Sequence, residues 1–409
     1  MHHQPQTTYP DRRWVVPLAA TVMVGFGIIL YGFSVYATDQ AAGADFSSSV
    51  LSIAYGGAVF VGGLTALPVG RFADRHGIRL IVGVGSVLAF TGFALFAVAR
   101  EPWHVIVAWW VLIGPAQAMV YYEPAYVAID QWASEPDRAR TLGTITVIGG
   151  LAGIVFIPLA ERLVALLGWR QAVFGLGTLL LVVGASTAVA ALPRWRSDWE
   201  HDTHRPAVAG DLLRDRRFLL YTLALMLILL STQGIIAHRV VRFEEGGLSV
   251  ATVAVWAAVA SAMSLPGRWI APRMAARYGP TRVQAIVAVV VAASVVLMID
   301  GSSSWQMIAH FALFGMAFGA LLPLRALVMG GWFSGPTFGR IMGVQWTGVV
   351  LVAAAGPVAV GLLRDATDSY RASFAMLTAF YVLAAAAILA SGRASNILPH
   401  EAGEDGPVS

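Results

Sequence analysis

Apolar stretches of about 20 residues recur along the whole chain, and they constrain its fold more than any other feature. An α-helix needs a stretch of about this length to cross the hydrocarbon core of a bilayer. Twelve can be placed, at residues 14–37, 49–69, 80–99, 103–130, 141–160, 170–192, 217–238, 249–270, 283–299, 305–330, 341–361 and 371–391. The sequence therefore predicts an all-α integral membrane protein with twelve transmembrane helices.

Charge is too scarce for a water-soluble protein of this size. Only 12% of the 409 residues are charged, whereas about 25% is usual for a soluble chain. The 27 basic residues are all arginines and are scattered, so the positive net charge does not indicate a nucleic-acid partner. There is no cysteine, which excludes disulfides, thiolate metal ligands and cysteine nucleophiles. The composition indicates a lipid bilayer as the main partner.

The arginines also predict an orientation, because cytoplasmic loops of membrane proteins carry an excess of positive charge. If both termini lie inside, 19 of the 27 arginines fall in inner segments and seven in outer ones. We therefore expect a multi-pass protein of the bacterial inner (plasma) membrane with both termini in the cytoplasm.

The chain divides into two halves. The longest polar stretch, 193–216, follows the sixth apolar stretch and reads as a cytoplasmic linker between six-helix halves at 1–192 and 217–391, with a cytoplasmic tail at 392–409. Four residues of the first half recur 200 positions later, in the pairs Trp132 and Trp332, Pro136 and Pro336, Arg140 and Arg340, and Gly143 and Gly343. Repeats in the same sense are typical of large secondary transporters.

The segment between the second and third stretches has the pattern G-x-x-x-D-R-x-G-x-R. Its defined positions are Gly70, Asp74, Arg75, Gly77 and Arg79. Gly70 permits two helices to approach closely, Gly77 permits a tight turn, and Asp74 can hold the end of a neighbouring helix by its charge. A degraded copy without the acidic residue occupies 267–282.

Twelve spans, a central linker and this loop in both halves resemble the major facilitator superfamily over the whole chain. The resemblance implies two pseudo-symmetric six-helix halves that rock about a central cavity lined by helices one, four, seven and ten. It assigns Gly70, Asp74, Arg75, Gly77 and Arg79 to the conformational gate, and it implies a monomer. The drug–proton antiporters of the family carry an arginine in span four, which this chain lacks. Residues 121–126 instead resemble bacterial monocarboxylate and oxalate carriers.

Two charges stand out deep within the apolar stretches, Glu123 in the fourth and Arg325 in the tenth. Each costs about 2.5–3.5 kcal/mol to insert, so a functional role is the default hypothesis. Arg325 could bind an anionic substrate, because a guanidinium fits a carboxylate, and Glu123 could carry a proton. Alternatively, the two form an ion pair between the halves without touching substrate, or they are structural. Asp130 is expected at a solvated helix end.

Four uncharged polar residues are further candidates for the substrate site: Tyr31, Gln117, Tyr121 and Gln233. Gln117 and Tyr121 are four residues apart and so share a helix face. For all four, lining of a cavity and hydrogen bonding between helices remain open alternatives. No cluster suggests a metal or hydrolytic centre, and no Walker pattern suggests ATP, so we expect no cofactor.

These observations predict a secondary active transporter of a small organic anion, with a carboxylate favoured. Transport would proceed by alternating access, as symport with protons or as exchange. The alternative is proton-driven efflux of hydrophobic or cationic compounds, in which Glu123 contacts the compound and Arg325 is its resting partner. A membrane enzyme is disfavoured because no catalytic cluster is present, and a receptor because no loop accommodates an extra domain.

Overall fold

The computed structural model describes residues 12–37, 41–193 and 212–394. Most of the expected linker and most of the expected tail lie outside these residues. Within the described ranges the chain is helical and contains no β-strand. The fold class expected from the apolar stretches is confirmed.

In the ranges that the structure describes, the N-terminal lobe is built from ten α-helical segments. They are α1 (Val15–Gly25), α2 (Phe33–Tyr36), α3 (Ser48–His76), α4 (Ile78–Ala97), α5 (Pro102–Val107), α6 (Gly114–Val120), α7 (Tyr122–Trp132), α8 (Glu135–Gly150), α9 (Ala152–Leu167) and α10 (Trp169–Ser186). Three π-helical turns extend or join them, at Phe26–Tyr31, Ala108–Ile113 and Thr187–Ala191. Short 3₁₀ turns lie at Arg12–Trp14 and Ala42–Ala44.

The C-terminal lobe has longer and less interrupted helices. They are α12 (Arg216–Glu245), α13 (Val250–Tyr278), α14 (Pro280–Asp300), α15 (Ser304–Phe333), α16 (Phe338–Ala353), α17 (Ala355–Thr367) and α18 (Tyr370–Arg393).

Helices occupy all twelve predicted positions. Among the described residues, eleven helical stretches are long and apolar enough to cross a membrane, each at one of the predicted places. The twelfth position is α13, a 29-residue helix whose second half carries Arg268, Arg273 and Arg277. The helices overrun the apolar stretches: α3 continues to His76, seven residues beyond the predicted end at 69. Apolar content marks the hydrocarbon core, and the backbone helix continues into the interface beyond it.

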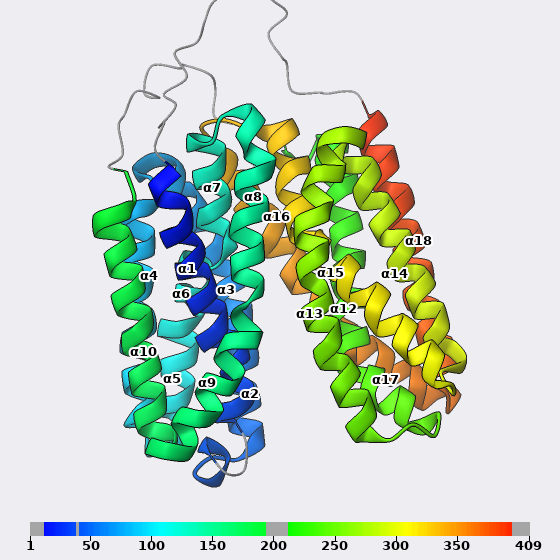
Figure 1. Cartoon of the computed structure of the whole chain (residues 1–409), viewed down its shortest axis with the longest axis horizontal. Helices are drawn as coiled ribbons and strands as arrows, with labels where there is room; N and C mark the ends of the chain where they lie inside the picture. Colours follow the sequence, from blue (N-terminus) through cyan, green and yellow to red (C-terminus); the bar gives the residue numbers. More distant parts are fainter. Residues whose placement is uncertain (1–11, 38–40, 194–211, 395–409) are drawn as a thin grey trace, which may run out of the picture.

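The helices form two bundles side by side, α1–α10 in one and α12–α18 in the other (Figure 1). The lobes meet mainly through α3 against α16 and α8 against α13. In Figure 1 they converge at the end where α7 gives way to α8, here called the linker end, and diverge toward α9 and α17. The contacts between the lobes are thus concentrated in one half of the bundle.

The fourth membrane crossing is broken in its middle. Helix α6 ends at Val120, Tyr121 is extended (φ −85°, ψ −154°), and α7 begins at Tyr122. Pro124 explains the break, because its ring has no N–H and would clash with the carbonyl of Val120 four residues earlier. The break places Glu123 in the first turn of α7, where the positive end of the helix dipole favours a carboxylate.

Candidate transport site

Glu123 and Arg325 meet at the interface between the lobes. Nη1 of Arg325 lies 2.7 Å from Oε1 of Glu123, and the Arg325 side chain is 2% exposed. The guanidinium also donates to Oε1 of Gln345 at 3.0 Å and to the carbonyl of Met342 at 3.2 Å. Its carbon lies 4.6 Å from the ring centre of Trp346. Arg325 is therefore fully engaged in this conformation.

Only one of the two oxygens of the Glu123 carboxylate accepts a hydrogen bond within the described chain. Oε1 accepts from Arg325, whereas Oε2 is buried and accepts no hydrogen bond within the described chain. A buried oxygen without a donor is costly, and a rearrangement that brings a donor to it would relieve that cost. The geometry matches the ion-pair alternative in this state. Whether Arg325 also binds substrate stays a prediction that requires the Glu123 contact to break.

A second buried arginine, Arg268 of α13, was not predicted as a site residue. It is 6% exposed. Its Nη1 donates across the lobe interface to the hydroxyl of Tyr122 at 2.9 Å and to the carbonyl of Thr146 at 3.2 Å. Its Nε is buried without an acceptor, and no ion pair to it is found in the described residues. Unlike Arg325, this cation has no carboxylate partner there.

The sequence did carry a signal for Arg268. It lies two residues before the end of the predicted stretch 249–270, yet the degraded loop motif led us to assign it to an inner segment. In the structure α13 continues as helix to Tyr278, so Arg268 lies within the helix that packs on α8. The small residue Gly150 makes room for it, because a Cβ there would lie 2.8 Å from Nε of Arg268.

Aromatic side chains surround Tyr122, the residue of the N-terminal lobe whose hydroxyl accepts a hydrogen bond from Arg268. Tyr121 stacks on Phe26 with ring centres 3.8 Å apart, and Tyr122 lies 4.9 Å from the same ring. Tyr31 packs against Gly153, where a Cβ would lie 3.1 Å from its ring. The phenols of Tyr31, Tyr121 and Tyr122 are close enough to interact electrostatically. The structure thus places the predicted residues Tyr31 and Tyr121 near Tyr122, which contacts Arg268.

The two predicted glutamines differ in burial and in their neighbours. Gln117 is 8% exposed, and its amide nitrogen is buried without a hydrogen-bond acceptor in the described chain. It packs on Gly62 of α3, because a Cβ added to Gly62 would lie 3.5 Å from the Gln117 side chain. Gln233 is exposed on α12 and makes no side-chain hydrogen bond to a described residue. The structure does not join Gln233 to the aromatic group.

The loop motif lies at the linker end, where the lobes touch. The carboxylate of Asp74 accepts hydrogen bonds from the backbone N–H groups of Gly339 and Arg340, both at 2.8 Å. It therefore caps the first turn of α16 from the opposite lobe. Gly70 lies directly against that turn, since a Cβ on it would be 2.1 Å from the carbonyl oxygen of Gly339.

The other motif residues stay within their own lobe. Gly77 separates α3 from α4 with φ 71°, a left-handed conformation that glycine adopts readily. Arg79 donates to the carbonyl of Val189 at 2.9 Å. The Arg75 side chain is exposed. Asp74 and Gly70 are thus the members of the motif that contact the second lobe.

Asp130 departs from the expected solvated helix end. Its carboxylate accepts from the Ser334 hydroxyl at 2.7 Å and from the Gly335 N–H at 3.1 Å, both in the other lobe. It also pairs with Arg138 at 3.3 Å, and its side chain is 5% exposed. Asp130 therefore acts beside Asp74 in holding the segment that joins α15 to α16. Sequence alone could not reveal this segment as its partner.

The contacts between the lobes span a limited depth. The Thr347 hydroxyl of α16 donates to the Gly63 carbonyl of α3 at 2.6 Å. From there the contacts run along α3 and α16 toward the linker end, to Asp74 and Gly339.

No group of three or more metal-ligating side chains is found among the residues that the structure describes.

Comparisons with known proteins agree with this architecture. The sequence profile of the Major Facilitator Superfamily matches residues 15–299. Human monocarboxylate transporter 11 is 28% identical over 76% of this chain and 68% of its own length. Multidrug resistance protein MdtH of Cronobacter sakazakii is 31% identical over 38% of each chain.

Solved structures share the fold. The transporter FucP in its outward conformation superposes with a TM-score of 0.77 over 94% of this chain and 100% of its own, at 11% identity. The matched family and fold are those of transporters and not of enzymes. The chain is a multi-pass membrane transporter that belongs to the Major Facilitator Superfamily.

Proposed function

We propose that this protein is a secondary active transporter of a small organic anion, most simply a carboxylate. One observation carries the proposal: Arg268 is a buried cation at the interface between the lobes, without a carboxylate partner in the described chain. A buried charge is costly unless it is paired. An anionic solute would supply the missing partner, and a guanidinium can hold a carboxylate with two parallel hydrogen bonds.

The neighbours of Arg268 suit such a solute. The hydroxyl of Tyr122 already contacts the guanidinium, and Tyr31 and Tyr121 lie close to Tyr122. Phenols offer hydrogen bonds at their tips and apolar ring faces for the body of an organic molecule. Because Arg268 belongs to one lobe and the phenols to the other, a solute between them would contact both.

In this proposal the Glu123–Arg325 pair is the coupling element. The pair joins the lobes, so it must break when the lobes separate at this depth. A proton on Glu123 would remove its negative charge and release Arg325, which could then bind the anion or be solvated. Proton symport is the simplest coupling consistent with this arrangement, and exchange is the variant without net proton movement.

Orientation follows from the arginines. We propose that the linker end faces the cytoplasm of a bacterial cell, in the inner membrane, and that the protein works as a monomer. The conformation described here, with the lobes in contact toward the linker end, is then the outward-facing state. Asp74 and Asp130 would hold the inner gate closed in that state.

The relatives support this reading to different extents. The name of monocarboxylate transporter 11 supports a carboxylate, and that relative matches over most of the chain. The alternative is efflux of hydrophobic or cationic compounds, which the stacked rings of Phe26 and Tyr121 and the name of the multidrug resistance relative favour. A cation would be repelled by Arg268, so we prefer the anion.

Thermal stabilisation of the detergent-purified protein tests the proposal, because a ligand of the folded state raises apparent stability by mass action. Acetate, lactate, pyruvate, oxalate and benzoate would be compared with tetraphenylphosphonium and with neutral sugars. We expect a carboxylate to stabilise the wild type, Arg268→Lys to retain part of the effect, and Arg268→Gln to lose it. Arg273→Gln is the matched control, since Arg273 is exposed on the same helix. Stabilisation by tetraphenylphosphonium alone, unchanged in Arg268→Gln, would contradict the proposal and favour efflux.

A further inference from the structure

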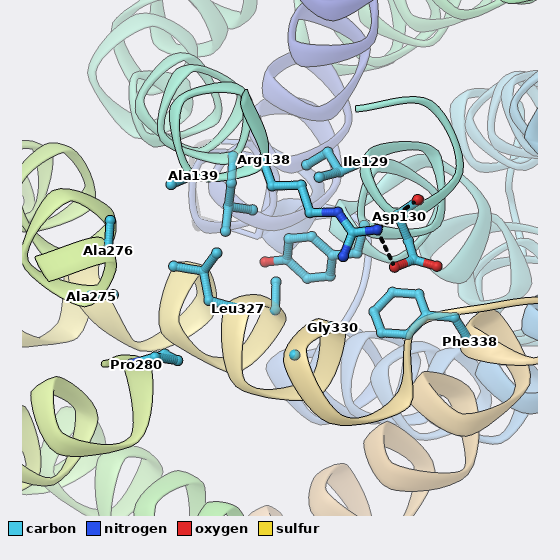
Figure 2. Close-up of a pocket in the computed structure, with 14 residues that line it drawn as sticks. Ile129, Asp130, Arg138, Ala139, Ala275, Ala276, Pro280, Leu327, Gly330 and Phe338 are labelled. Carbon is cyan, nitrogen blue, oxygen red and sulfur yellow. Dashed lines mark hydrogen bonds and ion pairs between the residues drawn. The ribbon is translucent and has the colours of Figure 1, made fainter. Parts of the chain in front are cut away.

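A cavity of about 360 Å³ lies between the lobes at the linker end. Its walls come from α7 and α8 of the N-terminal lobe and from α13 to α16 of the C-terminal lobe (Figure 2). Neither Arg268 nor the Glu123–Arg325 pair lines it. The cavity therefore has a different lining from the proposed transport site, although its Tyr126 stacks on Tyr122 of that site with ring centres 5.8 Å apart.

Small side chains create this cavity. Six of its lining residues are alanine or glycine: Ala139, Ala275, Ala276, Ala326, Gly330 and Gly331. A Cβ added to Gly330 or Gly331 would meet nothing within 4 Å, so both face open space. Ala276 and Gly331 are exposed, which places an opening to solvent at that edge. Pockets that bind small organic molecules measure roughly 300–1,000 Å³, so this one is large enough.

The polar groups of the cavity define what it can accept. Arg138 and Asp130 form an ion pair in its wall, at 3.3 Å, so their charges largely cancel (Figure 2). The hydroxyl of Tyr126 is buried and has no hydrogen-bond partner within the described chain, and the residue is 2% exposed. Buried hydroxyls are rarely left unpaired. The remaining wall is mostly apolar, including Ile129, Leu142 and Leu327.

We propose that this cavity is a regulatory site for an uncharged amphipathic molecule with a flat apolar body and one hydrogen-bond acceptor. The body would cover the alanine and glycine wall, and the acceptor would pair with the Tyr126 hydroxyl after a movement of that side chain, because the hydroxyl is itself buried. A net charge would find no free counter-charge, because Arg138 and Asp130 already neutralise each other.

Such a ligand acts on the conformational equilibrium. The walls of the cavity belong to both lobes, so the cavity is complete only while the lobes touch at the linker end. A molecule that binds one of two states more tightly shifts the population toward that state. The occupant would therefore hold the lobes closed at this end and inhibit transport without competing for the solute site.

Three probes with one ring system test the chemistry. We would measure thermal stabilisation by 2-acetylnaphthalene, 2-naphthoate and 2-naphthylmethylammonium. We expect 2-acetylnaphthalene to stabilise the wild type and Gly175→Leu, and to lose its effect in Gly330→Leu. Gly175 is the matched control because a Cβ there also meets open space, on α10 and away from the cavity. Tyr126→Phe should weaken 2-acetylnaphthalene binding by about three- to tenfold.

The probes also separate this site from the transport site. Stabilisation by 2-naphthoate or 2-naphthylmethylammonium that is lost in Gly330→Leu would overturn the proposal, because the cavity offers a charged molecule no free counter-charge. If 2-acetylnaphthalene stabilises wild type and Gly330→Leu equally, the cavity proposal is wrong. If Gly330→Leu fails to fold, Ala276→Leu fills the same space from α13 and replaces it in the comparison.

A distance measurement tests the regulatory effect. Because the chain has no cysteine, spin labels can be placed at His76→Cys and Tyr278→Cys, two exposed positions at the ends of α3 and α13. We expect 2-acetylnaphthalene to increase the population with the short distance. An unchanged distribution, or a shift toward longer distances, would overturn the regulatory role.

Discussion

Glu123 and Arg325 form an ion pair across the two lobes although 202 positions separate them in the chain. This separation is close to the offset of 200 at which Trp132 and Pro136 recur as Trp332 and Pro336. The two charges thus occupy nearly equivalent places in the two halves. Related positions of a two-fold pseudo-symmetric bundle can meet at its axis, and here they carry opposite charge.

This pair predicts a marked asymmetry between single and double variants. Removing one partner of a buried ion pair costs about 3–5 kcal/mol, because the other charge stays buried. Arg325→Gln and Glu123→Gln should each lower the melting temperature, and the double variant should recover part of the loss. Circular dichroism on the purified protein would measure this.

A surface pair on the same protein provides the comparison. Arg364 and Glu245 lie 3.4 Å apart with both side chains about 40% exposed. Arg364→Gln should therefore melt close to the wild type. Additive effects of the two substitutions at Glu123 and Arg325 would mean that the pair is not coupled in the folded protein.

The unsatisfied Oε2 of Glu123 leads to a prediction about coupling. Glu123→Gln cannot take up a proton, so we expect it to lose solute accumulation driven by a pH gradient while retaining solute exchange. Proteoliposomes with an imposed pH gradient would measure both activities. Glu161→Gln is the control, because Glu161 is exposed on α9. Accumulation at the wild-type level in Glu123→Gln would remove this carboxylate from the coupling path.

The cap that Asp74 provides for α16 should bias the equilibrium between the two conformations. Losing a capping side chain costs about 0.5–2 kcal/mol, which corresponds to roughly a two- to thirtyfold change in population. Asp74→Ala should therefore lengthen the distance between labels at the linker ends of α3 and α13. The same label distances in Asp74→Ala and wild type would show that the cap has no part in the gate.

Gly70 offers a test with a control on its own helix. A Cβ on Gly70 would lie 2.1 Å from the Gly339 carbonyl oxygen, whereas one on Gly56 would meet nothing within 4 Å. Gly70→Ala should push α3 and α16 apart and open the linker end. Gly56→Ala should be neutral or stabilise by about 0.5–1 kcal/mol, because alanine favours helix. Equal behaviour of the two variants in the distance measurement would contradict the close approach as a gate element.

Much of the geometry of the loop motif could be predicted from the sequence. The pattern of Gly70, Asp74 and Gly77 predicted a close helix approach, a held helix end and a tight turn, and each geometry is present at that residue. These features depend on local properties, namely a missing Cβ, a short carboxylate and a left-handed φ. Their role in gating stays a prediction.

The candidate site was less accessible to sequence reasoning. Tyr31 and Tyr121 come together, but Gln233 lies apart and Arg268 was assigned to a loop segment. Hydropathy reports how long a helix remains apolar and not how far it continues or which face meets a neighbour. The direction of a side chain around the helix axis depends on packing, which no local pattern encodes.

The sequence by itself determined that this protein is surrounded by lipid, where its helices lie, and that its two halves repeat. The reason is that about 20 apolar residues can satisfy their backbone in hydrocarbon only as helix. Only the tertiary structure decided that Arg325 is neutralised by Glu123 while Arg268 has no acidic partner in the described chain. The energy of a buried charge depends on which groups lie within a few ångströms of it, and distant segments supply those groups when the lobes pack.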